Sequence, residues 1–218
     1  MHSLFRLCYI TDGEVLSERS LDSVLAQAID AGIDLIQLRE KQMEVRALLG
    51  VASRALERAK GTNSRIVIND RVDAALALGA AGVHLGSHSL PALAVRAIAP
   101  PGFLVGVSCH SLEEAQTAEL AGADYILFGP VYETPSKLAY GPPLGVERLA
   151  AAAARVKTPV LALGGITLER VKPCLAAGAA GIAAIRLFQD APSLAQRVAE
   201  IRALINNQQA AEKPILSC

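Results

Sequence analysis

AGADYILFG, residues 121–129, is the stretch that decides the fold, because it joins the end of a helix to a buried strand. Apolar residues recur before it at spacings of three and four, in the pattern Leu112-Ala115-Ala118, which is typical of an amphipathic helix. Gly122 is expected to end that helix in a left-handed conformation. The apolar run that follows indicates a strand buried on both faces, as parallel strands are.

The same unit recurs along the chain. Similar phrases stand at residues 31–34 (AGID), 78–81 (LGAA) and 177–180 (AGAA). Apolar runs predict strands at residues 7–10, 35–39, 66–69, 82–85, 104–108, 125–129, 160–164 and 181–185. Strict alternation of strand and helix requires parallel pairing through crossover helices. An open doubly wound sheet is the competing arrangement, but no GxGxxG sequence follows the first strand.

We therefore expect an α/β protein with one domain, a closed (β/α)8 TIM barrel over residues 1–205. The length of 218 residues is sufficient for a compact barrel with a large core. Residues 206–218 are polar and lack a helical period, so we expect them to form a flexible tail.

Composition argues against several classes of function. Lys and Arg together number 21, as do Asp and Glu, so no basic surplus indicates binding to nucleic acid. Tryptophan is absent and aromatic residues make up 4%, which argues against base stacking. No apolar run approaches the roughly 20 residues of a membrane span. No cleavable leader pattern opens the chain, so a cytoplasmic location is expected. The four cysteines lack metal-type spacing and are expected to be free thiols.

Polar residues gather where the predicted strands end, and in this type of barrel those ends form the active site. Gln37 and Arg39 share one strand face by the period of two, and Lys41 follows directly. An amide and two cations at the barrel mouth favour an anionic substrate, which Arg meets with a planar fork and Lys with a point charge. The structural alternative is an ordinary ion pair with Glu40.

Three further strand ends carry candidate ligand-binding groups. Asn69-Asp70 closes the third strand, where it can bind a cation and can also begin the next helix as its N-cap; taken alone, the pair favours the cap. Gly164-Gly165 closes the seventh strand and Ile185-Arg186 the eighth, and barrels often bind phosphate there through backbone N–H groups. The alternative for the paired glycines is a simple tight turn.

His110 follows Ser108 at the end of the fifth strand. An imidazole with an ordinary pKa of about 6.5 can accept and donate a proton at neutral pH, so His110 is a candidate general acid and base. A hydrogen-bonded structural histidine is the alternative, and it is the preferred interpretation of His84, which lies within a strand. The longest loop carries Thr134-Pro135-Ser136-Lys137, in which two hydroxyls and an ammonium can surround an oxyanion.

These residues belong to motifs that occur in a fixed order. The motifs are Gln37-x-Arg39-x-Lys41, Asn69-Asp70-Arg71-Val72-Asp73, Gly82-Val83-His84-Leu85-Gly86, Gly106-Val107-Ser108-x-His110-Ser111, Gly122-Ala123-Asp124-Tyr125, Thr134-Pro135-Ser136-Lys137 and Gly164-Gly165-Ile166. As an ordered set they resemble the thiamine phosphate synthase and thiazole tautomerase superfamily, over residues 7–188. The resemblance implies a thiamine-biosynthesis enzyme, a phosphorylated thiazole substrate and a homodimer.

Two reactions divide this superfamily. A thiamine phosphate synthase, a transferase, joins an aminopyrimidine diphosphate to a thiazole phosphate with magnesium and expels pyrophosphate. For that reaction the resemblance assigns Asp70 to the metal, and it assigns to pyrophosphate the residues Arg39, Lys41, Asn69, Ser136 and Lys137. A thiazole tautomerase, an isomerase, needs no metal and aromatises a carboxythiazole phosphate by moving a proton. For that reaction the resemblance makes His110 the acid and base, and it assigns to the phosphate Gly164, Gly165 and the end of the eighth strand.

Departures from the synthase pattern favour the tautomerase. After Gly86 the synthase has Gln-Glu-Asp, whose Asp is the second metal ligand, whereas this chain has Ser87-His88-Ser89. A hydroxyl attracts Mg²⁺ far less than a carboxylate does. Arg186 also replaces a small serine, where it either strengthens phosphate binding or blocks the pocket.

Three functions are therefore ranked. The first is a thiazole tautomerase without cofactor, and the second is a synthase that uses Mg²⁺. The third is a barrel that has lost catalysis and binds metabolites of the thiamine pathway. The presence of His110, Asp70 and Lys137 argues against the third.

Overall fold

The computed structural model describes residues 5–16, 19–134 and 142–212, and it shows a closed barrel of parallel strands. The strands are β1 (Leu7–Ile10), β2 (Leu35–Leu38), β3 (Arg65–Asn69), β4 (Gly82–Leu85), β5 (Leu104–Cys109), β6 (Tyr125–Phe128), β7 (Val160–Leu163) and β8 (Gly181–Ala184). Each strand pairs with the next, and β8 returns to β1, where Leu7 lies opposite Ile182. The predicted TIM barrel is confirmed, and each predicted strand end is within one residue of the observed end.

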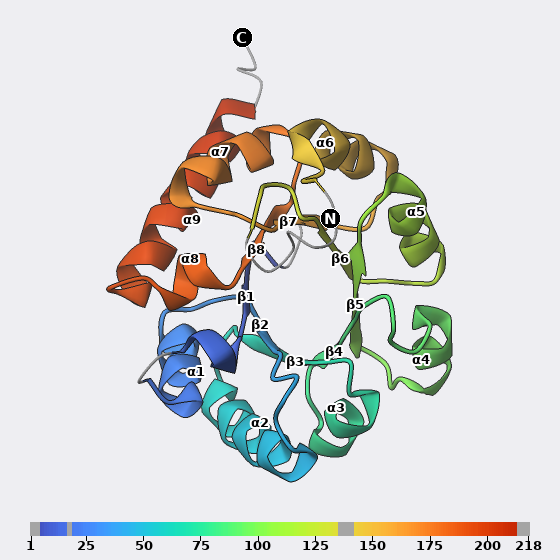
Figure 1. Cartoon of the computed structure of the whole chain (residues 1–218), viewed down its shortest axis with the longest axis vertical. Coiled ribbons are helices and arrows are strands. Elements are labelled where there is room, and N and C mark those ends of the chain that lie inside the picture. Colours follow the sequence, from blue (N-terminus) through green and yellow to red (C-terminus); the bar gives the residue numbers. More distant parts are fainter. Residues whose placement is uncertain (1–4, 17–18, 135–141, 213–218) are drawn as a thin grey trace, which may run out of the picture.

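Helices form a ring outside the strands (Figure 1). They are α1 (Leu21–Asp30), α2 (Val45–Ala59), α3 (Val72–Leu78), α4 (Ala92–Ile98), α5 (Leu112–Leu120), α6 (Gly145–Arg155), α7 (Leu168–Ala176), α8 (Arg186–Gln189) and α9 (Leu194–Glu212). A 3₁₀ turn, Gly13–Val15, follows β1. None of the helices in the described part of the chain combines the length and apolar character of a membrane span.

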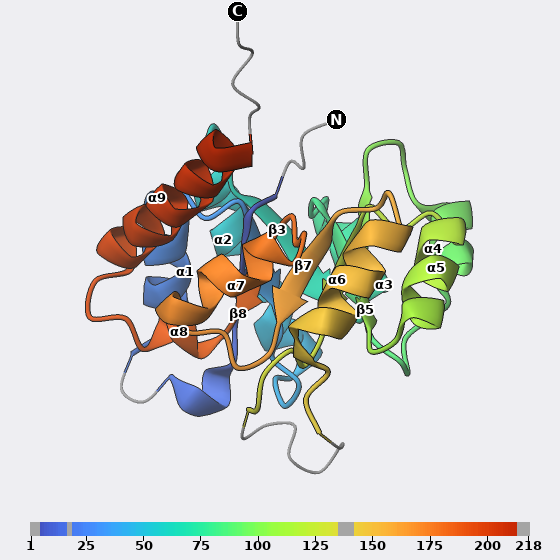
Figure 2. The same ribbon diagram turned by 90° about the horizontal axis from the view of Figure 1, so that it is seen from above.

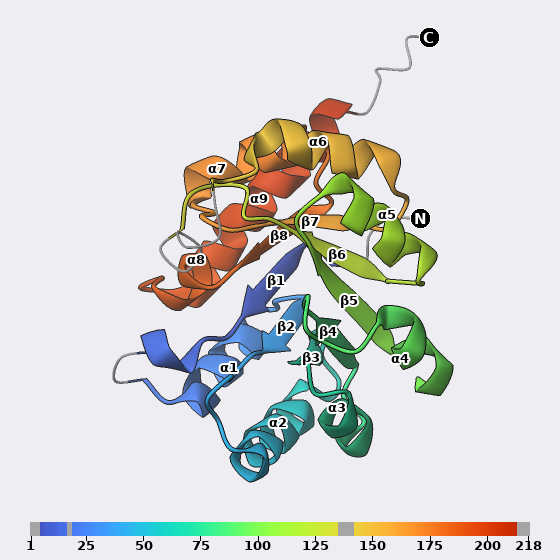
Figure 3. The same ribbon diagram turned by 45° about the vertical axis from the view of Figure 1, so that its right-hand side comes forward.

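Neighbouring helices close the outer layer. Figure 2 shows α9 lying beside α1 and α7, so the last helix packs against the first. On another side of the barrel, α2 and α3 pack together outside β3 (Figure 3). The barrel strands are therefore covered by helices, as the continuous apolar runs require.

Helix α9 extends beyond the boundary predicted at residue 206, since it ends at Glu212. Val198, Ile201 and Ile205 are buried and fix the preceding turns against the barrel. The sequence NNQQAAE at residues 206–212 then continues the helix, because extending a formed helix by good helix formers such as Gln and Ala is favourable. The prediction that a flexible tail begins at residue 206 therefore misses this turn of helix, and residues 213–218 lie outside the described residues.

The glycines predicted to end helices adopt the expected left-handed conformation. The φ angles are 74° at Gly32, 63° at Gly79, 80° at Gly122 and 88° at Gly178. Each position leads directly into a strand, so these turns fix where the next strand enters the barrel.

The barrel interior is packed rather than hollow. Phe5 meets the ring of Tyr125 edge-on, with the ring centroids 6.1 Å apart. Gly106 of β5 gives this ring its space, because a Cβ atom at Gly106 would overlap the Tyr125 side chain. With the interior filled, the accessible polar end of the barrel is the rim where the strands end.

Substituting Gly106→Ala is expected to reduce the free energy of unfolding by about 1–3 kcal/mol, because the added methyl overpacks the barrel interior. Gly50→Ala is the matched control, since Gly50 lies in α2 and a Cβ there would meet only the flexible side chain of Arg54, at 3.5 Å. That change is expected to stabilise the protein by about 0.5–1 kcal/mol. Urea denaturation measures both, and a Gly106→Ala variant as stable as wild type would contradict the packing described.

Candidate active site

The predicted site residues that the structure describes lie at one end of the barrel, where parallel strands finish together. Gln37 and Ser108 are the penultimate residues of β2 and β5, and Asn69 ends β3. Gly164 and Ile185 directly follow β7 and β8. Because the sheet is closed, these positions surround one mouth.

Thr11 anchors the end of β2 to the end of β1. Its fully buried hydroxyl accepts a hydrogen bond from the Arg39 backbone N–H at 2.9 Å and donates to the Glu40 carboxylate at 2.6 Å. The other Glu40 oxygen accepts from the Gly13 N–H at 2.9 Å. Burial raises the pKa of Glu40, and the hydrogen bond from Thr11 partly opposes that rise. Glu40 therefore links the loop after β1 to the end of β2.

Arg39 forms a weak ion pair with Asp12. Among the described residues, the alternative pair with Glu40 is not formed. The guanidinium Nη1 lies 4.0 Å from an Asp12 oxygen, and both side chains are partly exposed. A pair of this kind contributes at most about 1 kcal/mol. Arg39 can therefore exchange this contact for an anionic ligand at little energetic loss.

Gln37 carries a buried donor that the protein leaves unsatisfied. The residue is 2% exposed, and its Nε2 has no hydrogen-bond partner among the described residues. It shares the inner face of β2 with Leu35, which belongs to the interior cluster. An unpaired buried amide costs about 1–3 kcal/mol. A ligand acceptor atom at the mouth would remove that cost.

His84 is a structural residue inside the barrel, as its place within a strand predicts. Its Nδ1 lies 3.2 Å from the Tyr125 hydroxyl and its Nε2 lies 2.8 Å from Ser108 Oγ. Burial, assisted by the charge of Arg39, lowers the pKa of His84 to about 3. The buried phenol is satisfied if it donates to Nδ1, in which case Nε2–H donates to Ser108. The Ser108 hydroxyl hydrogen then remains available to a ligand.

His110 is oriented by contacts at both ends. Its Nδ1 contacts the Gly129 carbonyl oxygen, and its backbone N–H donates to Glu114 at 2.6 Å. A carbonyl oxygen only accepts, so Nδ1 carries a hydrogen, and in the neutral ring the lone pair is then on Nε2. That Nε2 bonds to no described residue. The ring thus has the tautomer that a general base requires.

Asp70 adopts a left-handed backbone conformation, with φ 64°, and among the described residues no other non-glycine residue has a positive φ. The prediction that Asn69-Asp70 caps the next helix is wrong, because the N-cap of α3 is Arg71 and makes no side-chain capping bond. The Asp70 N–H instead donates to the His84 carbonyl at 2.8 Å, continuing the sheet by one residue. This leaves an exposed carboxylate at the rim.

The side chains present fit Mg²⁺ only in a shared site. Ser89 Oγ accepts a hydrogen bond from the Gly86 N–H at 2.8 Å, so that hydroxyl already has a partner. Within the described ranges no group of three His, Cys, Asp or Glu residues could hold a metal. Mg²⁺ is often held by one or two carboxylates together with substrate phosphates, so Asp70 could serve only as the protein's part of such a set.

The paired glycines form a turn that no other residue could adopt without strain. The φ angles are 95° at Gly164 and 63° at Gly165. Ile185 packs against the apolar interior, so its backbone rather than its side chain is available at the rim. Arg186 begins the short helix α8 and is exposed.

Other predicted residues are less well placed by the structure. Lys41 is exposed in the loop after β2, and Thr134 is half-buried after β6. Ser136 and Lys137 lie outside the described residues. Thr11 was not predicted as a site residue. Thr11-Asp12 is a polar pair directly after the first strand, so the rule applied to the other strand ends could have found it. Arg170 was missed as well, and its contact with the Gly165 carbonyl at 2.7 Å has no sequence signature.

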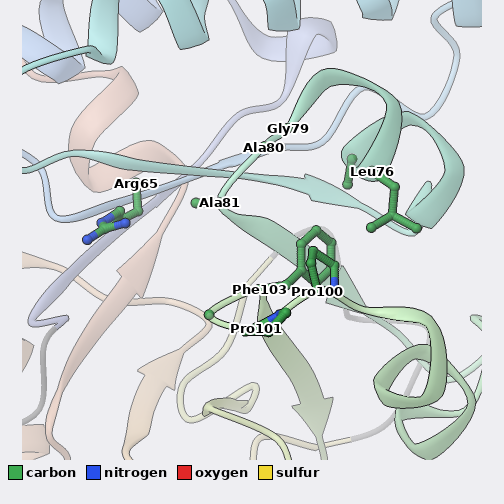
Figure 4. A pocket seen from close by; sticks show the side chains of 10 residues that line it. Arg65, Leu76, Gly79, Ala80, Ala81, Pro100, Pro101 and Phe103 are labelled. Carbon is green, nitrogen blue, oxygen red and sulfur yellow. The ribbon is translucent and has the colours of Figure 1, made fainter.

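A separate surface hollow of about 210 Å³ lies at the opposite end of the barrel, around the starts of β3, β4 and β5. Its lining includes Gly79, Pro100 and Phe103, and Arg65 extends on the side away from Leu76 (Figure 4). It is smaller than the cavities that usually bind small molecules, about 300–1,000 Å³, and it holds none of the predicted site residues. We therefore place the candidate site at the rim.

The three described cysteines agree with the free-thiol prediction. Cys8, Cys109 and Cys174 are unpaired and buried. Burial raises the pKa of the Cys109 thiol to about 12, so the thiol stays protonated and unreactive although it stands beside His110.

Most of the chain matches a known protein family. The family profile described as thiamine monophosphate synthase matches residues 7–188. The chain belongs to this family. A protein of Geobacter sulfurreducens, provisionally named a thiamine-phosphate synthase, is 46% identical over 202 residues, which cover 92% of this chain and 94% of the relative. The thiamine-phosphate synthase of Roseiflexus sp. is 41% identical over 84% of this chain and 78% of the relative.

A solved structure of the same family shares the fold. The thiamine phosphate pyrophosphorylase of Pyrococcus furiosus superposes with a TM-score of 0.85 at 30% identity, over 95% of this chain and 98% of that one. The two sequence relatives carry synthase names, the solved structure is named a pyrophosphorylase, and none of the three is named a tautomerase. The comparisons thus support the synthase alternative better than the tautomerase, which the sequence departures had favoured.

Replacing Thr11 by Val keeps the side-chain shape and removes both of its hydrogen bonds. We expect a loss of about 2 kcal/mol in the free energy of unfolding, because one oxygen of the partly buried Glu40 carboxylate and the Arg39 N–H lose their partner. Thr11→Ser, which keeps the hydroxyl, is the control and should lose about half as much. Equal stability of the Val variant and wild type, measured in urea, would show that Thr11 does not anchor the rim.

His84 makes stability depend on pH in a defined window. The unfolded imidazole gains its proton below about pH 6.5, whereas the folded one stays neutral until about pH 3, so stability is lost as the pH falls between these values. Between about pH 6 and pH 4 the wild-type curve should fall more steeply than that of His84→Gln, by up to about 1.4 kcal/mol per pH unit. Urea denaturation at several pH values tests this, and parallel curves would contradict it.

Proposed function

We propose that the protein is a thiamine-phosphate synthase, which joins an aminopyrimidine diphosphate to a thiazole phosphate and releases pyrophosphate. Family membership over residues 7–188 and the synthase names of relatives at 40–46% identity support the proposal. The single observation that carries it is the exposed carboxylate of Asp70, on a left-handed backbone, at a mouth that also presents Arg39. A carboxylate beside an anionic substrate is unfavourable unless a cation accompanies that substrate.

The residues at the ends of β2 and β3 would bind the diphosphate. Arg39 can release Asp12 and form a charge-assisted pair with a phosphate oxygen, and Lys41 adds a mobile positive charge. Asn69 can donate from its amide to the same group. Ser136 and Lys137 are assigned to pyrophosphate by the resemblance alone.

Magnesium would be held between the substrate and the protein. When bound to the diphosphate, Mg²⁺ neutralises charge on the leaving pyrophosphate. Asp70 is the residue that would hold it, and Ser89 could add no more than a neutral hydroxyl that already accepts from Gly86. The cofactor is thus expected to bind more weakly than in a site with two carboxylates.

Inner-face residues would orient the aminopyrimidine. The unpaired Gln37 Nε2–H can donate to a ring acceptor, and the Ser108 hydroxyl, held by His84, can donate beside it. The thiazole phosphate would then lie at the Gly164-Gly165 turn and the start of α8, where backbone N–H groups bind the phosphate. Positioning both partners replaces a bimolecular encounter by a step within one complex.

A thiazole tautomerase is the second candidate, and His110 is the observation that favours it. Its Nδ1 contacts Gly129, so Nε2 could remove and return a proton. General acid–base catalysis of this kind contributes about 10²–10⁴-fold. Ser89, at the position where the synthase pattern has the second metal-binding Asp, also suits a reaction without metal. A homodimer, a cytoplasmic location and the absence of nucleic-acid and membrane partners remain predictions from the sequence.

The deciding experiment assays both reactions side by side, each with Mg²⁺ and with EDTA. We expect pyrophosphate release from the synthase substrates with Mg²⁺, its loss in EDTA, and a fall of about 10²-fold or more in Asp70→Asn. Asp73→Asn is the matched control, because it removes a nearby exposed carboxylate, which forms an ion pair with Arg71.

Aromatisation of carboxythiazole phosphate in EDTA, without pyrophosphate release, would replace the proposal by the tautomerase. In that case His110→Ala should abolish turnover. Tight binding of these metabolites with neither reaction would indicate the non-catalytic barrel.

A further inference from the structure

The loop after β6 and the turn after β7 are joined by backbone hydrogen bonds. The Val131 N–H donates to the Leu163 carbonyl at 2.8 Å, and the Tyr132 N–H donates to the Gly164 carbonyl at 3.1 Å. These bonds continue the pairing of β6 with β7 past the ends of both strands. The β6 loop leads to Thr134, and the β7 turn is the proposed phosphate site, so these bonds hold two parts of the mouth against each other.

The contact between them is too close for side chains on the turn. A Cβ at Gly164 would lie 2.6 Å from Pro130 Cα, and a Cβ at Gly165 would lie 2.8 Å from Tyr132 Cβ. Both glycines also have positive φ angles. The conformation of the turn therefore depends on where the β6 loop lies, and the reverse is also true.

Arg170, in the first turn of α7, contacts both segments. Its Nη1 donates to the Gly165 carbonyl at 2.7 Å, and its guanidinium carbon lies 4.5 Å from the centre of the Tyr132 ring. The side chain is half-buried. A planar guanidinium can stack on an aromatic ring and donate from its edge at the same time, which a lysine ammonium cannot do.

The bond from Arg170 also fixes the direction of the next N–H group. A trans peptide is planar, so its C=O and N–H point in opposite directions. Since Arg170 holds the Gly165 oxygen, the Ile166 N–H of that peptide points to the side away from Arg170. A phosphate bound over the turn could accept from this N–H only while the peptide keeps that orientation.

We propose that Arg170 is a positioning residue for the phosphate of the thiazole substrate, acting through the Gly165–Ile166 peptide and the Tyr132 ring rather than by touching the substrate. The proposal rests on the proposed function for the identity of the phosphoester. Phosphate binding at the Gly164-Gly165 turn can be measured without any reaction. The positioning role of Arg170 and the proposed synthase reaction can therefore be tested separately.

The test compares Arg170→Ala with Lys172→Ala, which removes an exposed cation from the same helix. With the aminopyrimidine diphosphate saturating, Arg170→Ala is expected to raise the KM for thiazole phosphate about tenfold while kcat changes less than about threefold. Lys172→Ala should leave both constants unchanged. Arg170→Lys should fall between wild type and Ala, because an ammonium can reach the carbonyl but stacks poorly on Tyr132.

A second readout does not depend on turnover. Inorganic phosphate should raise the Tm of wild type and Lys172→Ala, since a ligand that binds only the folded state stabilises it, and should raise the Tm of Arg170→Ala much less. If Arg170→Ala fails to fold, Tyr132→Leu, which removes the ring beneath the guanidinium, should show the same loss in part.

The outcomes separate the two proposals. An unchanged KM and an unchanged phosphate shift in Arg170→Ala overturn the positioning role, as does a wild-type protein that phosphate does not stabilise. A wild-type protein without synthase turnover, whose phosphate shift disappears in Arg170→Ala, overturns the proposed reaction and keeps the positioning role.

Discussion

Closure of the sheet between β1 and β8 is the constraint on which the rest of the structure depends. In an open sheet with the same strand order, β2 and β7 would lie five strand spacings apart, about 24 Å. Pairing of Leu7 with Ile182 bends the sheet into a ring and places the ends of both strands on one rim. Cations from the first half of the chain and the glycine turn from the second half can then serve one substrate.

The rim is assembled at the expense of local stability. Gln37 has a buried donor without a partner in the described part of the chain, Asp70 has a left-handed backbone, and His84, which contacts Ser108, stays neutral. Each of these features is unfavourable or neutral for folding, and together they lie where the barrel opens. Such concentration of strain and unpaired polar groups is typical of sites that acquire their missing partners from a ligand.

The fold could be predicted from the sequence because each of its signals is local. Buried parallel strands read as continuous apolar runs, and Gly122 and its counterparts mark the turns into them. The extent of α9 could not be predicted, because residues 206–212 have no apolar period and are helical only as a continuation of packed turns. The cap expected at Asp70 was wrong because the sheet hydrogen bond to His84 outweighs the local preference of Asn-Asp. The Arg170 contact joins three segments and has no local signal at all.

The branch of the family was harder to predict than the family. Departures such as Ser89 in place of a carboxylate favoured the tautomerase, whereas similarity over 94% of the length of the Geobacter sulfurreducens relative favours the synthase. One residue changes metal affinity, but it changes neither the barrel nor most of its rim. Fold and family are thus fixed by many positions and the reaction by few.

The ends of β2, β3 and β7 are proposed to form one anion-binding site at the rim of the barrel. Titration of ¹⁵N-labelled protein with inorganic pyrophosphate and Mg²⁺, followed by amide NMR shifts, tests it most directly. The account predicts that the largest changes fall on the amides of Arg39, Asp70 and Gly165. Changes confined to the opposite end of the barrel, around Gly79 and Phe103, or no saturable change at the rim, would contradict it.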